Sequence, residues 1–342
     1  MRHTPSIPSS LEGEGEGGGY GREAAKKSFR TPTGVSPLPV PPPQGGRGPS
    51  LCLRALLATA CLALSIWPVR AERIALDGSF IQGGLVRGTT EPGTAITFDG
   101  TAVRVGHDGG FLLGFGRDFK TRAALSAKFP DGTSEARKLT VEARKYDIQR
   151  VDGLPPQQVS PSPEDLARIA AEDSALKAAR TRFTDRPWYR EGFSWPALGP
   201  ISGAYGSQRI LNGEPRAPHL GTDIAAPEGT EVRAPASGEV SLARANLFFT
   251  GNTVLLDHGR GLATLYAHLS AISVREGDTL QKGVVIGRIG KTGRVTGPHL
   301  HWAAYLFETR LDPALLVGPM PSAASGGEST ATAPGAREST PR

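Results

Sequence analysis

The sequence predicts an all-β protein, with a small β-sandwich domain, one linker helix and a larger antiparallel β-sheet or barrel-sandwich domain. Glycine and proline, 44 and 29 of the 342 residues, favour strands and turns over long helices. Turn dipeptides such as Asp108-Gly109 and Asp131-Gly132 separate short runs in which polar and apolar residues alternate. Beyond residue 195, no stretch with helical periodicity exceeds two turns.

Residues 73–145 are the predicted small β-sandwich domain. Alternating runs such as 102–105 recur at regular spacing between turns, as in sandwiches built from short strands. His107 lies beside a turn with no other metal-ligand type close by in the sequence, so we expect a solvated loop histidine. We therefore assign no chemistry to this domain.

Residues 146–194 are the predicted linker, and it contains one helix at 163–182. Ser162 is a good N-cap, Pro163 suits the first helical position, and the two acidic residues that follow complement the helix dipole. Apolar residues then recur at helical spacing. We interpret this element as a structural helix between two domains.

Residues 195–317 are the predicted larger β domain, with buried strands expected at 254–256 and 284–287. The chain that follows, residues 318–342, is rich in serine, alanine, glycine and threonine. This composition is typical of a disordered tail.

The first 71 residues differ in composition from the rest. Residues 1–50 carry runs of glycine and proline and few large apolar side chains, which predicts a disordered leader. Residues 51–71 contain a 13-residue apolar stretch, too short to span a bilayer as a helix and typical of a signal peptide cleaved after Ala71. An uncleaved membrane anchor is the alternative. A leader of this length indicates either a start codon placed too far upstream or an unusual export signal.

The cysteine content also favours export, and the charge of the exported part says little about partners. Cys52 and Cys61 both lie in the predicted signal peptide, so the exported chain would have no thiol, which suits an oxidising compartment. The formal charge of +6 falls to +2 for residues 72–342, because residues 1–71 carry eight Lys/Arg and four Glu. So weak a charge does not indicate a nucleic-acid partner. We expect a periplasmic or cell-envelope protein that contacts the membrane only transiently, through its export signal.

Four of the seven histidines fall in three clusters of the larger β domain. The first cluster pairs His219 with Asp223, and both residue types are good zinc ligands. The second is His268, which follows an apolar run. The third is His299 and His301, and residues at i and i+2 of a strand project on the same face. The three clusters together predict one site.

Each cluster alone has a simpler interpretation, because a single histidine in a β domain is usually structural. We interpret His258 in that way, since it fits a turn after a strand. Two imidazoles on one face are different, because they repel each other when protonated and need a partner such as a metal. Three such clusters in one domain are much less expected by chance.

In this order, these residues resemble the lysostaphin-type (LytM-like) zinc metallopeptidases. The resemblance covers about residues 195–317 and implies that the larger domain is a peptidase domain. It covers residues 73–145 only loosely, as the kind of N-terminal module that exported members carry. Further segments resemble the family: 221–227, 234–238, 251–254, 266–270 and 290–301.

The resemblance implies a role for each of the five residues. His219, Asp223 and His301 would bind one zinc ion per chain and leave its fourth position open for water or substrate. His268 and His299 would orient and deprotonate the zinc-bound water and stabilise the tetrahedral oxyanion. The chain has no His-Glu-x-x-His motif, so proton transfer cannot rest on the glutamate of that other class.

The family hydrolyses peptide bonds in bacterial cell-wall peptidoglycan, so the resemblance implies a zinc metalloendopeptidase that has peptidoglycan as its substrate. The bond could lie in a peptide cross-link, which we favour, or in a glycine bridge. The main alternative is a non-catalytic relative that activates cell-wall amidases, but such relatives have lost ligands and this chain has all five residues. The oligomeric state is left open.

Two further alternatives are weaker. Residues 238–240, 274–278 and 283–287 resemble the β-barrel of biotinyl and lipoyl carrier domains. A carrier needs an exposed lysine, usually flanked by methionine, and beyond residue 71 the chain has only Met320. A bacteriocin acting on other cells usually carries a wall-targeting domain after the catalytic one, where this chain has its predicted tail.

Overall fold

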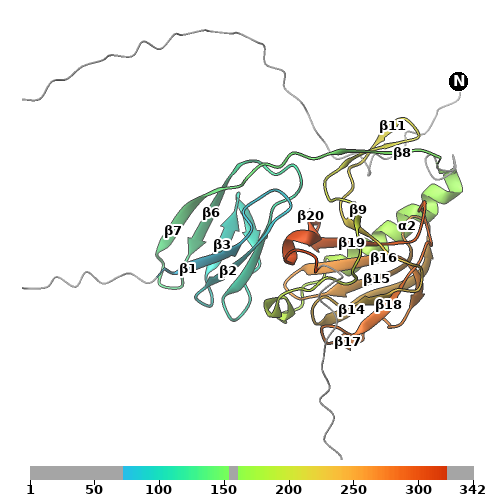
Figure 1. The fold of residues 1–342 in the computed structure, drawn as a ribbon. Helices are drawn as coiled ribbons and strands as arrows, with labels where there is room; N and C mark the ends of the chain where they lie inside the picture. Colours follow the sequence, from blue (N-terminus) through green and yellow to red (C-terminus); the bar gives the residue numbers. More distant parts are fainter. Residues whose placement is uncertain (1–71, 154–160, 322–342) are drawn as a thin grey trace, which may run out of the picture. The chain divides into compact units, whose positions relative to one another are not determined.

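The computed structural model describes residues 72–153 and 161–321. The predicted leader (1–50), signal peptide (51–71) and most of the predicted tail (322–342) lie outside the described residues, as does part of the linker (154–160). In the part of the chain that is described, no helix is long and apolar enough to cross a membrane. Figure 1 shows the arrangement of the strands and of the helix.

The first part of the described chain is a β-sandwich. Strand β6 alternates exposed and buried residues along its whole length, so one face lies against the core and the other faces solvent. Buried side chains from both sheets, among them Phe111 and Leu125, share one hydrophobic cluster. One sheet contains β1 (Ile74–Gly78), β2 (Leu85–Thr90) and β5 (Gly110–Gly114), and the other contains β3 (Ala95–Phe98), β4 (Thr101–Val103), β6 (Arg122–Lys128) and β7 (Ser134–Thr140).

The single α-helix of the described residues is α2 (Pro163–Arg180). The Ser162 hydroxyl accepts a hydrogen bond from the Asp165 backbone N–H, which satisfies one of the free donors at the helix start. The helix ends two residues earlier than the sequence predicts, with Thr181 as its C-cap. Leu176 and Ala179 pack in one cluster with residues of the larger sheet. A short 3₁₀-helix, η1 (Trp188–Glu191), follows.

The larger sheet is antiparallel, and the predicted all-β class is confirmed. Its strands follow the order β17-β14-β15-β16-β19-β12-β9, with β18 joining β13 to β16, and β20 pairing with β19. The two ends of this path do not pair, so the described strands form an open antiparallel sheet and no closed barrel. The strands are β9 (Ile201–Gly203), β12 (Thr222–Ala225), β13 (Glu231–Arg233), β14 (Gly238–Leu247), β15 (Gly251–Asp257), β16 (Leu262–Ile272), β17 (Thr279–Leu280), β18 (Val285–Ile289), β19 (His299–Leu306) and β20 (Thr309–Leu311), and the 3₁₀-helix η2 (Pro313–Leu316) follows.

A separate three-stranded sheet lies beside the main one. Part of the predicted linker, β8 (Ile148–Val151), pairs in parallel with β10 (Gln208–Leu211), which in turn forms a hairpin with β11 (Glu214–Arg216). Parallel pairing was not expected. The residue pattern within the four-residue strand β8 does not predict this pairing, because its partner β10 is distant in the sequence.

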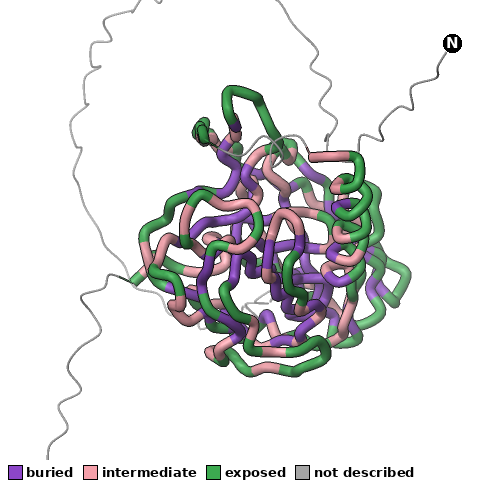
Figure 2. The backbone as a smooth tube through the Cα atoms, turned by 90° about the vertical axis from the view of Figure 1, so that its right-hand side faces the viewer, coloured by how far each residue is buried: buried purple, intermediate pink, exposed green. Residues whose placement is uncertain are grey.

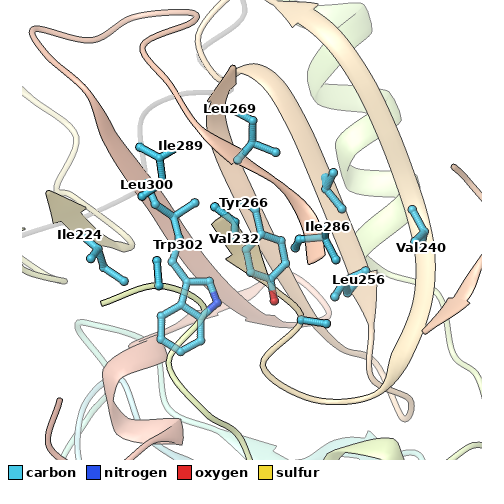
Figure 3. Packing of buried hydrophobic residues seen from close by; sticks show 13 residues of the cluster. Ile224, Val232, Val240, Leu256, Tyr266, Leu269, Ile286, Ile289, Leu300 and Trp302 are labelled. Carbon is cyan, nitrogen blue, oxygen red and sulfur yellow. The ribbon is translucent and has the colours of Figure 1, made fainter. Parts of the chain in front are cut away.

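The core of the larger domain is built from large side chains on neighbouring strands (Figure 3). Tyr266 of β16 lies directly opposite Trp302 of β19, and both are fully buried. Figure 2 shows the buried residues inside and the exposed ones on the outer loops. Trp195 donates a hydrogen bond to the Gly318 carbonyl, and Met320 packs against the core, so packed residues continue past position 317.

Candidate metal centre

Strand pairing brings Asp223 and His301 together. Strand β12 pairs antiparallel with β19, and in this register Asp223 lies directly opposite His301. Directly opposite residues project on the same face of a sheet, about 5 Å apart. His219 lies three residues before β12, and its backbone exchanges hydrogen bonds with Ser207 and Gly206. These contacts hold its ring over the same face.

Three ligand atoms converge at this point. Asp223 Oδ1 lies 2.8 Å from His301 Nδ1 and 3.1 Å from His219 Nε2. The two ring nitrogens are 3.0 Å apart. The side chains of His219 and Asp223 are buried, and that of His301 is 17% exposed. The group is therefore compact and largely buried, and His301 is its most exposed member.

The spacing and the surroundings fit a tetrahedral metal. Zinc with bonds of about 2.0–2.1 Å separates its ligand atoms by about 3.4 Å, so a small expansion of this triangle accommodates the ion. His219 Nδ1 lies 3.3 Å from the Ala204 carbonyl oxygen, to which it donates, and this leaves the lone pair on Nε2. Two imidazole lone pairs facing each other across 3.0 Å repel unless a cation or proton lies between them. The donor set therefore fits zinc.

The electrostatics of the three residues also favour a cation. Burial raises the pKa of Asp223, but the close contacts with His219 and His301 outweigh it and hold the pKa well below its usual range. Burial lowers the pKa of His301 to about 4, although Asp223 opposes the shift. At neutral pH the centre thus contains an ionised carboxylate and a neutral imidazole, the forms that bind metal.

His268 is held in an unusual backbone conformation. Its φ is +64°, in the left-handed region that a β-strand residue rarely adopts. Its backbone N–H donates to the Thr250 carbonyl, 2.8 Å away, and its Nδ1 donates to the Thr292 carbonyl, 2.9 Å away. Such strain, of order 1–3 kcal/mol, is maintained only where surrounding contacts enforce it, and it concentrates at functional sites. Here the contacts leave Nε2 without a backbone partner.

The structure places His299 next to His268. The ring centroid of His268 lies 4.9 Å from the ring centroid of His299 and 6.0 Å from the ring centroid of His301. His299 Nδ1 donates to the Gly297 carbonyl, 2.9 Å away, and its Nε2 lies 3.8 Å from Asp223 Oδ1. All five residues selected from the sequence therefore come together, and His268 and His299 share one tautomer.

The comparisons with known proteins agree with this geometry. The sequence profile of peptidase family M23 matches residues 217–313, which include all five residues of the site. Residues 217–313 form a peptidase family M23 domain. This match confirms the resemblance to the lysostaphin-type peptidases.

Curated relatives share the M23 domain. The DD-carboxypeptidase/endopeptidase Mpg of Neisseria meningitidis serogroup B is 46% identical over 103 residues, which are 30% of this chain and 24% of the relative. The peptidoglycan DD-endopeptidase ShyA of Vibrio cholerae is 49% identical over 86 residues, 25% of this chain and 20% of the relative. The chain thus spans about a quarter or less of the length of these relatives.

One solved structure extends the similarity beyond the M23 domain. The structure of a putative peptidase M23 from Pseudomonas aeruginosa has a TM-score of 0.52 and 29% sequence identity. It covers 70% of this chain, and this chain covers 94% of it. The shared fold is therefore larger than residues 217–313 alone.

The other described histidines lie in different surroundings. His258 is fully buried, with Nδ1 2.8 Å from the Ser237 carbonyl and Nε2 2.7 Å from Thr264 Oγ1, so both ring nitrogens have partners within the fold. His107 is exposed, as expected for a solvated loop histidine, and it also bonds Asp185.

Sequence reasoning missed residues around the M23 site. Arg209 Nη2 lies 3.4 Å from Asp223 Oδ2, and nothing in the sequence near Arg209 indicates this contact. A Cβ at Gly221 would overlap the His301 ring, and one at Gly203 would overlap the Asp223 carboxylate. For Gly221 the sequence offers one signal, its position two residues before the predicted ligand Asp223. For Arg209 and Gly203 it offers none.

Proposed function

We propose that this chain is a zinc-dependent endopeptidase that hydrolyses peptide cross-links in bacterial peptidoglycan, exported to the periplasm or cell envelope. The observation that carries the proposal is the convergence of His219 Nε2, Asp223 Oδ1 and His301 Nδ1 on one point. The M23 relatives named as DD-endopeptidases support the cross-link as the substrate.

His219, Asp223 and His301 would hold one zinc ion and leave one tetrahedral position open to water or substrate. Bound there, zinc would polarise the scissile carbonyl and lower the pKa of water. Because only one of the three ligands is anionic, the centre keeps a net positive charge. That charge favours the oxyanion that forms as the carbonyl is attacked.

We assign proton transfer and oxyanion stabilisation to His268 and His299. In both residues Nδ1–H donates to a backbone carbonyl, so Nε2 carries the lone pair that accepts a proton from the attacking water. Burial, together with the nearby His301 and His299, lowers the pKa of His268 to about 3. His268 is therefore neutral at pH 7, the form that can accept a proton.

The alternative, a non-catalytic activator of amidases, is not favoured. An activator needs none of the five side chains, yet here all five converge, and two of them have their tautomers set by backbone carbonyls. A binding role also gives no reason for the left-handed backbone of His268.

Digestion of purified peptidoglycan tests the proposal. The full chain, loaded with zinc, should release fragments whose masses identify a cleaved cross-link, and His268→Ala should release none. The matched control is His107→Ala, which removes an exposed histidine outside the M23 domain and should digest like the wild type. Intact cross-links after treatment with the zinc-loaded wild type would leave the amidase-activator alternative standing.

A further inference from the structure

The metal ligand His219 is positioned by a short turn, residues 204–207, that follows β9. Its ring Nδ1 donates to the Ala204 carbonyl, and its backbone N–H donates to the Ser207 carbonyl, 2.8 Å away. The His219 carbonyl in turn accepts a hydrogen bond from the Gly206 N–H, at 2.6 Å. The turn therefore sets both the backbone position of this ligand and the tautomer of its ring.

The same turn is bonded to the β-sandwich. Arg117 lies in the loop between β5 and β6, and its Nε donates to the Gly206 carbonyl, 2.7 Å away. Gly206 is thus bonded in two directions, to Arg117 through its carbonyl and to His219 through its N–H. We propose that Arg117 is a positioning residue of the metal centre, which acts through Gly206 to hold His219 where it binds the ion. The proposal rests on the proposed function and gives the β-sandwich a part in it.

Arg117 is itself fixed on the sandwich. Phe115 and Phe119, on either side of it, pack with the hydrophobic cluster of the sandwich, and their ring centroids are 5.2 Å apart. The Arg117 side chain is 17% exposed, and its Nη1 lies 2.6 Å from Asp118 Oδ1. An arginine that is already ordered loses little further rotamer freedom when it bonds the turn. The bond to Gly206 can therefore transmit the position of the sandwich to the turn.

Tyr146 fills the space between Arg117 and the turn. The guanidinium carbon lies 4.5 Å from the centre of the Tyr146 ring, and the Tyr146 hydroxyl donates to the Arg117 carbonyl, 3.3 Å away. Gly206 has a φ of +86°, and a Cβ at this position would overlap the Tyr146 ring. The Tyr205 hydroxyl donates to the Arg310 carbonyl, 2.9 Å away, on the side of the larger domain. The turn is therefore packed between the two domains.

This arrangement matters because a metal ligand has to be placed accurately. Groups that orient a ligand without touching the ion typically change metal affinity or activity by about 10–100-fold when they are removed. Backbone carbonyls orient His219, so no single substitution removes them, and the side chain that holds their turn is the group that can be changed. Arg117 is that side chain, and it comes from the other domain.

A second contact of the sandwich supplies a matched control. Asp108 Oδ1 lies 2.7 Å from Arg260 Nη2, and its Oδ2 lies 2.8 Å from Arg190 Nη1. This contact also joins the sandwich to residues that follow the linker helix, but its partners lie outside the turn 204–207. Asp108→Asn should therefore weaken the attachment of the sandwich without changing the support of His219.

The test measures the Kd for zinc of the full chain by competition with a chromogenic chelator. Arg117→Met has a methyl group at the position of Nε and should raise the Kd about tenfold. Arg117→Gln has an N–H donor at the same position and should recover most of the affinity. Arg117→Lys keeps the charge but has a methylene there, so it should bind zinc less tightly than Arg117→Gln. Asp108→Asn should have the Kd of the wild type.

Equal zinc affinity of the wild type and Arg117→Met overturns the inference and leaves the proposed function intact. So does an equal loss in Arg117→Met and Arg117→Gln, or in Arg117→Met and Asp108→Asn, because the bond from Nε would then not be the cause. If Arg117→Met does not fold, Arg117→Gln and Arg117→Lys decide, and equal affinity of these two overturns the inference.

A wild type that binds no zinc contradicts the proposed function, and the metal-free protein then tests the inference. Nitrogen NMR reports the tautomer of His219, which should be protonated on Nδ1 in the wild type and in Arg117→Gln, and mixed in Arg117→Met. The same tautomer in all three proteins would show that Arg117 does not position His219.

Discussion

His258 and His268 are two buried histidines of the same β-sheet domain with opposite uses of the ring. In His258 both nitrogens are bonded within the fold, to Ser237 and Thr264. In His268 only Nδ1 is bonded to the backbone, and the ring centres of His299 and His301 lie 4.9 and 6.0 Å from its own. Burial lowers both pKa values, so burial and titration alone do not separate a structural histidine from a catalytic one. The two residues differ in their ring nitrogens, because His268 Nε2 has no backbone partner whereas both nitrogens of His258 are bonded.

The backbone distinguishes the two residues as well. His268 has a φ of +64°, whereas His258 is not among the residues with positive φ in the described chain. The strain at His268 is maintained by the Thr250 and Thr292 carbonyls, which come from two loops. The backbone strain that orients the His268 ring thus lowers the stability of the fold, whereas the hydrogen bonds of the His258 ring raise it.

The largest effect is expected from His268→Ala. Removal of the proton acceptor should lower kcat on peptidoglycan by on the order of 10²–10⁴. Zinc content should be unchanged, because His268 is not among the three residues whose ligand atoms converge. Metal analysis and turnover of one preparation measure both. Wild-type turnover, or a parallel loss of zinc, would show that His268 is not a proton acceptor.

His258→Ala should have the converse effect. It removes a fully buried ring and leaves the Ser237 carbonyl and the Thr264 hydroxyl without their partner, at a cost of about 2–4 kcal/mol in the free energy of unfolding. Folded protein should retain wild-type zinc content and kcat. Urea unfolding followed by an activity assay checks both, and a selective loss of kcat would put His258 among the catalytic groups.

A smaller effect is expected in the pH dependence of stability. Burial lowers the pKa of His258 from 6.5 to about 4. Between these two values the unfolded chain binds more protons than the folded one, so this residue makes stability fall as the pH falls from 6.5 to 4, and it has no effect above 6.5. In His258→Gln the slope of unfolding free energy against pH should be smaller by up to about one proton. Equal slopes in urea titrations between pH 4.5 and 7 would mean that His258 is not buried in its neutral form.

The part of the site that could be predicted from the sequence depends on local geometry. His299 and His301 are two residues apart on β19 and both partly exposed, while Leu300 between them is fully buried, as the period of a strand requires. The turn dipeptides and alternating runs likewise indicate an all-β fold, because turn chemistry and alternation are properties of neighbouring residues.

The rest depends on contacts between distant segments. The left-handed backbone of His268 is held by hydrogen bonds to the carbonyls of Thr250 and Thr292. No residue type near His268 in the sequence predicts this conformation. Arg209 contacts Asp223 because the hairpin β10–β11 and the linker strand β8 pair beside the main sheet. The failure of the sheet to close into a barrel is also a matter of which strands pair, and periodicity within a strand does not determine it.

Zinc content tests the central claim most directly. Metal analysis should find about one zinc ion per chain in the wild type and in His258→Ala, and none in His219→Ala. After removal of the metal by a chelator, one equivalent of zinc should restore cleavage of peptidoglycan by the wild type. A folded wild type that binds no zinc, or that cleaves equally well without it, would contradict the claim that His219, Asp223 and His301 form the metal centre of a peptidase.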